Sequence, residues 1–85
     1  MKLPVIRSVA EFVESNDAES VEKAVGVLEH LSQVRGMKEE EINVIGELIS
    51  NLCGGMEVAK MVESGKPQRE ALNEFMQRVM GSIDK

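Results

Sequence analysis

Apolar residues recur every three or four positions along most of this chain, and short polar or glycine-containing stretches interrupt the pattern. That spacing places apolar side chains on one face of a helix and predicts four helical segments. The first covers residues 4–15 and opens on Pro4, whose missing N–H suits the first position of a helix. Asn16 or Asp17 caps the second, which we expect to run to Val34 and to end at Arg35-Gly36.

The third segment is the longest and runs from Met37 or Lys38 to Ser64. Its apolar residues step by three and four along a heptad seam, and further apolar positions widen this seam beyond one face. Gly54-Gly55 interrupts the segment, and two interior glycines cost roughly 2 kcal/mol relative to alanine. The helix is therefore continuous, with a neighbour packed closely on the glycines, or kinked at this point, or broken in two.

Gly65-Lys66-Pro67 is the clearest turn in the sequence, because glycine suits a helix C-terminus and proline the start of the next helix. The fourth helix is expected from Pro67 to Met80, where Gly81 ends it and a short tail follows. Connections this short favour antiparallel helical hairpins.

The fold class predicted from these segments is all-α. We expect residues 1–85 to form a single helical domain, since chains of this length rarely subdivide. The domain is a compact bundle of four helices, or of five if the third helix breaks at Gly54-Gly55.

Composition and charge narrow the range of partners. The net charge is −5, and its excess lies in residues 1–47, which carry ten acidic and five basic residues against five of each in residues 48–85. An acidic surface repels phosphate, so nucleic acid and anionic membranes are disfavoured. Phe12 and Phe75 are the only aromatic residues, which leaves few platforms for stacking bases or anchoring small molecules.

The cellular location follows from what the sequence lacks. No apolar run is long enough for a signal peptide or a membrane span. A single cysteine permits no disulfide within the chain. These features predict a cytoplasmic location, and the short chain without linkers suggests a bacterial protein.

No residue stands in a recognisable catalytic, cofactor-binding or metal-binding pattern, so we expect neither an enzyme nor a cofactor. Cys53 is the one thiol and has no CxxC partner, and its sequence neighbours supply no positive environment to activate it. We expect it to be a small buried residue, with a redox role as the alternative. His30 has no further ligands at helical spacing and is expected at the solvent boundary.

Polar residues form a row on the third helix, and a polar turn precedes the fourth helix. Asn43, Glu47 and Asn51 form a row at intervals of four, which we expect to face solvent, the alternative being a buried strip that sets register in an oligomer. The turn before the fourth helix resembles a helix-turn-helix, but Glu70 and Glu74 on that helix disfavour DNA binding.

Three stretches resemble a family of small uncharacterised bacterial proteins: Met1-Lys2-Leu3-Pro4-Val5-Ile6, residues 44–51 and residues 75–85. The resemblance covers nearly the whole chain and implies no known activity and no catalytic residues. It also implies genomic neighbours similar to thioredoxin and peroxiredoxin, which would make a redox-associated partner conceivable. One cysteine cannot run a dithiol cycle, so the chain itself is not expected to be an oxidoreductase.

The third helix carries the functional hypothesis, because it is apolar around much of its circumference and few helices are present to cover it. We expect an interaction or adaptor module that forms a homodimer or binds another cytosolic protein. The alternatives are a redox accessory protein acting through Cys53 and, less favoured, a small enzyme or metal protein. The expected interaction surface comprises Ile42, Ile45, Ile49, Leu52, Met56 and Met61.

Overall fold

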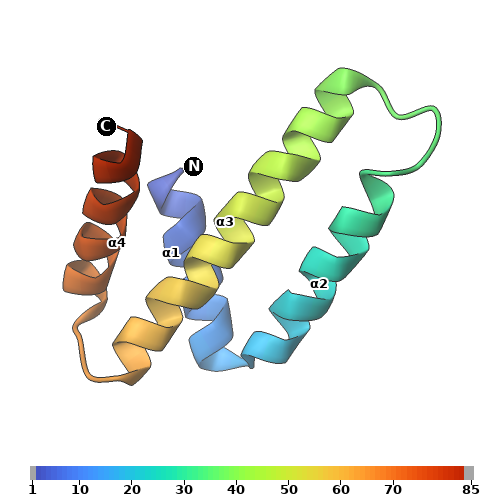
Figure 1. The fold of residues 1–85 in the computed structure, drawn as a ribbon. Helices are drawn as coiled ribbons and strands as arrows, with labels where there is room; N and C mark the ends of the chain where they lie inside the picture. The colour runs from blue at the N-terminus through green and yellow to red at the C-terminus, as the bar shows by residue number, and fades with distance from the viewer. Residues whose placement is uncertain (1, 84–85) are drawn as a thin grey trace.

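The computed structural model describes residues 2–83, with side chains described through Val79. This part of the chain is helical and contains no strand, which confirms the predicted all-α bundle of four helices. Figure 1 shows the four helices in chain order: α1 (Leu3–Ser15), α2 (Ala18–Leu31), α3 (Glu39–Glu63) and α4 (Gln68–Ile83).

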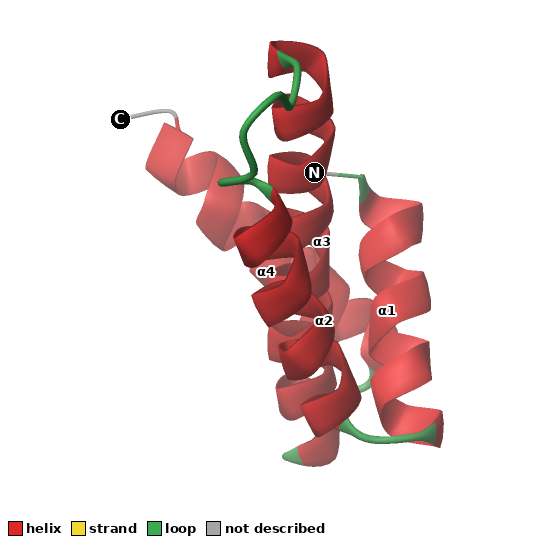
Figure 2. Ribbon diagram, turned by 90° about the vertical axis from the view of Figure 1, so that its right-hand side faces the viewer, coloured by secondary structure: helices red, strands yellow, loops and turns green. Residues whose placement is uncertain are grey.

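Helix α3 lies at the centre, and the other three helices pack against it. The backbone N–H of Lys2 donates a hydrogen bond of 3.2 Å to the Asn51 side chain, so α1 starts beside the middle of α3. From there α1 follows the second half of α3, and the side view places α1 and α4 on different sides of it (Figure 2). Helix α1 contacts α2 much less than it contacts α3.

Helix α3 is continuous through Gly54-Gly55, which excludes the alternative of a helix broken in two and a bundle of five helices. A Cβ atom added to Gly55 would lie 2.3 Å from Cγ1 of Val9 on α1. One added to Gly54 would lie 2.9 Å from Cζ of Phe75 on α4. The first of the three interpretations therefore holds, since the glycines allow two neighbouring helices to approach the backbone of α3 closely.

The hydrophobic core lies where α1, α3 and α4 meet. Ile6 and Val58 are completely buried, and the ring of Phe75 fills the space beside Gly54. An ion pair of 3.0 Å between Arg78 and Glu57 also joins α4 to α3. Helix α2 contributes no member to this cluster, whose buried residues are Ile6, Ala10, Val58, Ala59, Ala71, Leu72 and Phe75.

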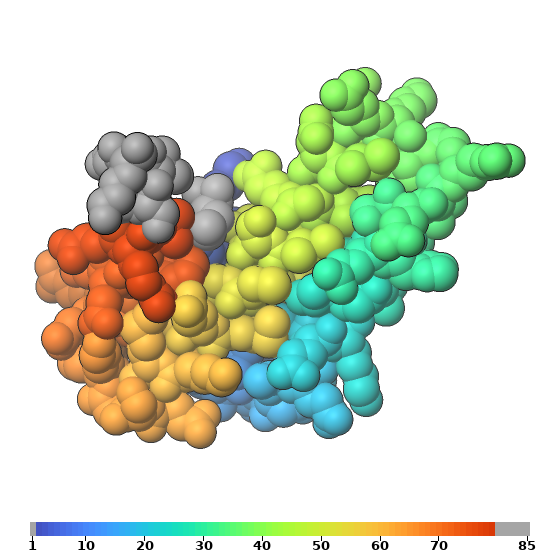
Figure 3. All heavy atoms as spheres, in the orientation of Figure 1, coloured from blue at the N-terminus to red at the C-terminus, as the bar shows by residue number. Residues whose placement is uncertain are grey.

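The α2–α3 hairpin extends beyond this core. Its far part, residues 25–50, is the second half of α2, the connecting loop and the first half of α3, and we call it the arm. Because α1 begins beside Asn51, the arm projects past the rest of the molecule, as the space-filling view shows at its upper right (Figure 3).

The ends of α2 and α4 differ from the prediction. Asp17 alone caps α2, accepting a hydrogen bond of 2.6 Å from the Ser20 N–H. The helix ends at Leu31 instead of Val34, because the Ser32 hydroxyl donates to the Glu29 carbonyl and a turn follows.

The fourth helix starts at Gln68, one residue later than predicted, with Pro67 directly before it, and its predicted end is wrong. It continues through Gly81 to Ile83, because a glycine weakens a helix by about 1 kcal/mol without forbidding it. The last two residues of the predicted tail, 84 and 85, lie outside the described residues.

Candidate functional site

The six residues of the predicted interaction surface do not lie together. Ile45 is buried, and Met61 packs against the core cluster. Ile49 and Met56 line a hollow between α2, α3 and α4, whereas Leu52 lines a groove between α1 and α2. Ile42 is exposed on the arm. The heptad seam is therefore divided between two sides of α3.

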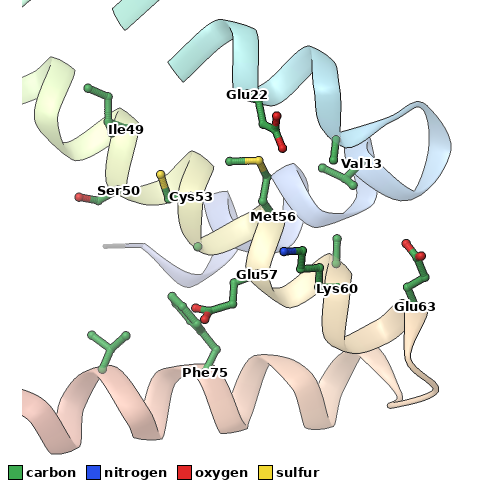
Figure 4. A pocket seen from close by; sticks show the side chains of 14 residues that line it. Val13, Glu22, Ile49, Ser50, Cys53, Met56, Glu57, Lys60, Glu63 and Phe75 are labelled. Carbon is green, nitrogen blue, oxygen red and sulfur yellow. The ribbon is translucent and has the colours of Figure 1, made fainter. Parts of the chain in front are cut away.

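The hollow is an open depression of about 810 Å³ with a mixed lining. Figure 4 shows it between the helices, with Cys53 and Met56 from α3 and Phe75 from α4 at its wall. Its charged residues are three carboxylates and one ammonium group, which come from Glu22, Glu57, Glu63 and Lys60. The lining contains no histidine.

Cys53 is exposed, so the expectation that it would be buried is wrong. The physical reason is its position beside Gly54-Gly55. Gly54 lies close to α4 and Gly55 lies close to α1. Cys53, one residue earlier on the helix, therefore faces the open hollow. Cys53 also lies mid-helix and not at a helix N-terminus, where a thiolate would be stabilised.

The predicted polar row is divided as well. Asn43 and Glu47 face solvent as expected, whereas Asn51 is buried, with 3% of its surface exposed. Its side-chain oxygen accepts the Lys2 N–H, so this asparagine fixes where α1 begins. His30 is exposed, and no group of three metal-ligating side chains lies close enough together to hold an ion in the described part of the chain.

The groove between α1 and α2 has a volume of about 400 Å³ and lies over α3. Its walls are apolar or hydroxyl-bearing, and none of its lining residues is charged. Phe12, one of the two aromatic residues of the chain, stands beside it with 47% of its surface exposed. The lining residues are Val5, Ser8, Val9, Phe12, Ser20, Val21, Ala24 and Leu52.

Two apolar rows continue from this groove along the arm. On α2, Ala24 lines the groove, and Val27 and Leu31 follow at intervals of three and four, which place them on the same side of the helix. On α3, Leu52 lines the groove, and Leu48 and Val44 precede it at intervals of four. Val27 is 59% exposed and Val44 57% exposed.

Each row starts from a residue that lines the groove, and we call the groove and the two rows together the apolar face. Its arm portion was the part that sequence reasoning missed. The pattern contained a signal, because Val27 and Val44 are apolar residues at helical spacing that the predicted interaction surface left out. The apolar face comprises Val5, Val9, Phe12, Ala24, Val27, Leu31, Val44, Leu48 and Leu52.

A family model matches residues 1–84, which is nearly the whole chain. The chain belongs to the family of unknown function DUF6952. Membership in DUF6952 confirms the resemblance to an uncharacterised helical family and assigns no activity to any residue. Neither a search of curated proteins nor a search of solved structures finds a match.

The helices of this DUF6952 member can also be compared with what a membrane-spanning helix requires. Among the described residues, no helix combines the length and the apolar character that crossing a membrane requires. The apolar face is a surface feature shared by three amphipathic helices.

Proposed function

We propose that this chain is a non-enzymatic interaction module of the bacterial cytoplasm, which binds a protein partner through the apolar face. The observation that carries the proposal is that exposed apolar rows on α2 and α3, which include Val27 and Val44, each start from a residue lining the uncharged groove beside Phe12. Single exposed apolar residues are ordinary on protein surfaces. A contiguous group is typical of a site where another molecule binds.

The energetics favour a protein partner. Complete burial of one valine or leucine side chain stabilises a complex by about 1.5–3 kcal/mol, and a few such residues supply most of the affinity of a typical interface. Val27, Val44, Leu31 and Leu48 each keep two-fifths or more of their surface exposed, which leaves this free energy available for binding. The open groove beside Phe12 would receive an apolar side chain of the partner.

Affinity purification from the native host tests this function. Wild-type protein and a Val27→Lys, Val44→Lys double variant would be captured side by side, and the proteins recovered with each compared. We expect the double variant to lose a protein that the wild type retains, because lysine in these rows forces a charge into an apolar contact. If every protein recovered with the wild type also comes with the variant, the apolar face is not the binding site.

The exposure of Cys53 favours a second candidate function, that of a redox accessory protein. In this reading the Cys53 thiolate attacks a partner's disulfide, forming a mixed disulfide and releasing one partner thiolate. Thiol titration in native buffer separates the two functions. A redox role predicts rapid reaction of Cys53 and capture of a mixed disulfide that the Cys53→Ala variant cannot form. A thiol that reacts no faster than a free cysteine, with no mixed disulfide, would exclude this second function.

A further inference from the structure

We infer that the partner on the apolar face is a second copy of this chain, bound face to face as a homodimer. The inference rests on the proposed function and deepens it, since it names the occupant of the same surface. Three properties of the molecule support it: the amount of surface left exposed, the shape of the arm and the distribution of charge.

The exposed area exceeds what a chain of this mass leaves exposed. The accessible surface is 6072 Å² for a mass of 9.4 kDa. A folded monomer of that mass exposes about 5,000 Å². The excess of about 1,000 Å² is close to the roughly 800 Å² that each partner contributes to an interface of standard size.

An extended shape accompanies this excess of exposed surface. The radius of gyration is 13.8 Å, whereas a compact domain of 85 residues has about 12 Å. The shortest dimension of the molecule is 17 Å, so the chain is a thin slab with little depth in which to bury a second side of each helix. Among the described residues of the arm, the first half of α3 has only α2 beside it, because α1 begins at Asn51.

A second hairpin completes this arrangement. Two antiparallel helices can cover only one side of each other, whereas four helices enclose a common core. A twofold axis brings the same apolar face of both copies together, so Val27, Leu31, Val44 and Leu48 of each copy meet the equivalent rows of the other. The same contact then buries the exposed apolar residues of both copies.

Charge also favours a second copy. The chain carries a net charge of −5, so copies that met through acidic surfaces would repel each other. None of the residues that line the groove or form the two rows is charged. Glu40, Glu41 and Glu47 lie three or four residues from Val44 and border the face, so a contact between two copies would be confined to the uncharged rows.

The test is the molar mass in solution, measured by size-exclusion chromatography with light scattering over a concentration series. The wild type is expected to have twice the chain mass at tens of micromolar. Val44→Lys is expected to raise the dissociation constant of the dimer at least about 100-fold, because it places a charge in the buried contact. Val27→Lys is expected to act in the same way from the other row.

Ile42→Lys is the matched control. Ile42 is also exposed on the first half of α3, but two positions along a helix turn the side chain about 200° away from Val44. The same charge is introduced, so its dissociation constant is expected to change by no more than about twofold. Circular dichroism at low concentration, where every variant is a monomer, checks that each one retains the wild-type helix content.

The outcomes separate the inference from the proposed function. A wild type that stays monomeric at hundreds of micromolar overturns the homodimer. If Val44→Lys then still abolishes the capture of another protein, the interaction function stands with a different partner. If it changes no captured protein either, both fail. A dimer that Ile42→Lys dissociates and Val44→Lys does not would overturn the inference as well, because the contact would lie on the other side of α3.

Discussion

The two halves of α3 have different surroundings. Residues 51–63 are enclosed by α1 and α4 as well as α2, and this half contains the completely buried Val58 and both glycines that neighbouring helices contact. Residues 39–50 have α2 as their one neighbouring helix in the part of the chain that the structure describes, and Val44 and Leu48 stay exposed. A similar apolar sequence is therefore a core element in one half and an open surface in the other. The number of neighbouring helices makes the difference.

The largest expected loss of stability comes from the core where α1, α3 and α4 meet. Phe75→Ala should lower the free energy of unfolding by about 3–5 kcal/mol, because it removes the ring that fills the space beside Gly54 and leaves a cavity. Chemical denaturation measures this loss. The arm provides the control, since Val27→Ala should change the stability of the monomer by no more than about 0.5 kcal/mol. Equal losses at the two positions would mean that the arm is packed as tightly as the core.

One substitution at two glycines of α3 should change stability in opposite directions. Gly55→Ala should destabilise the fold by about 1–3 kcal/mol, because the added Cβ would lie 2.3 Å from Cγ1 of Val9. Gly46→Ala should stabilise it by up to about 1 kcal/mol, because its Cβ would meet no atom within 4 Å and alanine favours a helix. Thermal unfolding of the two variants compares them directly. A stabilising Gly55→Ala would show that α1 does not pack closely on α3.

Leu52 lies where the two halves meet and should show an intermediate effect. It is half-buried and lines the groove, so Leu52→Ala should cost about 1–2 kcal/mol, less than a fully enclosed leucine. Denaturation below the concentration of self-association gives this value. A second measurement at high concentration should show a larger loss if a partner covers the groove, because the side chain is then enclosed on both sides.

The smallest expected effect depends on pH and concerns Asp17, which caps the start of α2. The Ser20 N–H donates to the Asp17 carboxylate and lowers its pKa below the usual value of 3.8. A group with a lowered pKa in the folded state stabilises the fold above its unfolded pKa, and this contribution is lost as the pH falls through the folded pKa. Unfolding measured from pH 5 downwards should therefore show an acid-dependent loss that is smaller in Asp17→Asn, whose side chain also caps the helix but does not titrate. Identical pH profiles would contradict this role.

The local features of the fold were predictable because each depends on a few neighbouring residues. Pro4 lies in the first turn of α1 and Pro67 directly precedes α4, Gly65 provides the left-handed turn with φ of 116°, and the period of apolar residues defines four helices. Where two local signals competed, the prediction failed. The turn after Ser32 ended α2 before Val34, and α4 continued through Gly81.

The surroundings of each side chain could not be derived in this way, because they depend on where α1 begins. The buried Asn51 ties the start of α1 to the middle of α3, and this one contact divides α3 into an enclosed half and an open half. The same placement sets the close approach at Gly54-Gly55 and turns Cys53 outward. The sequence by itself determined four amphipathic helices and a surplus of apolar residues on the third. The tertiary structure decided which of these residues are core and which form the apolar face, since burial depends on the positions of neighbouring helices and not on the period of one helix.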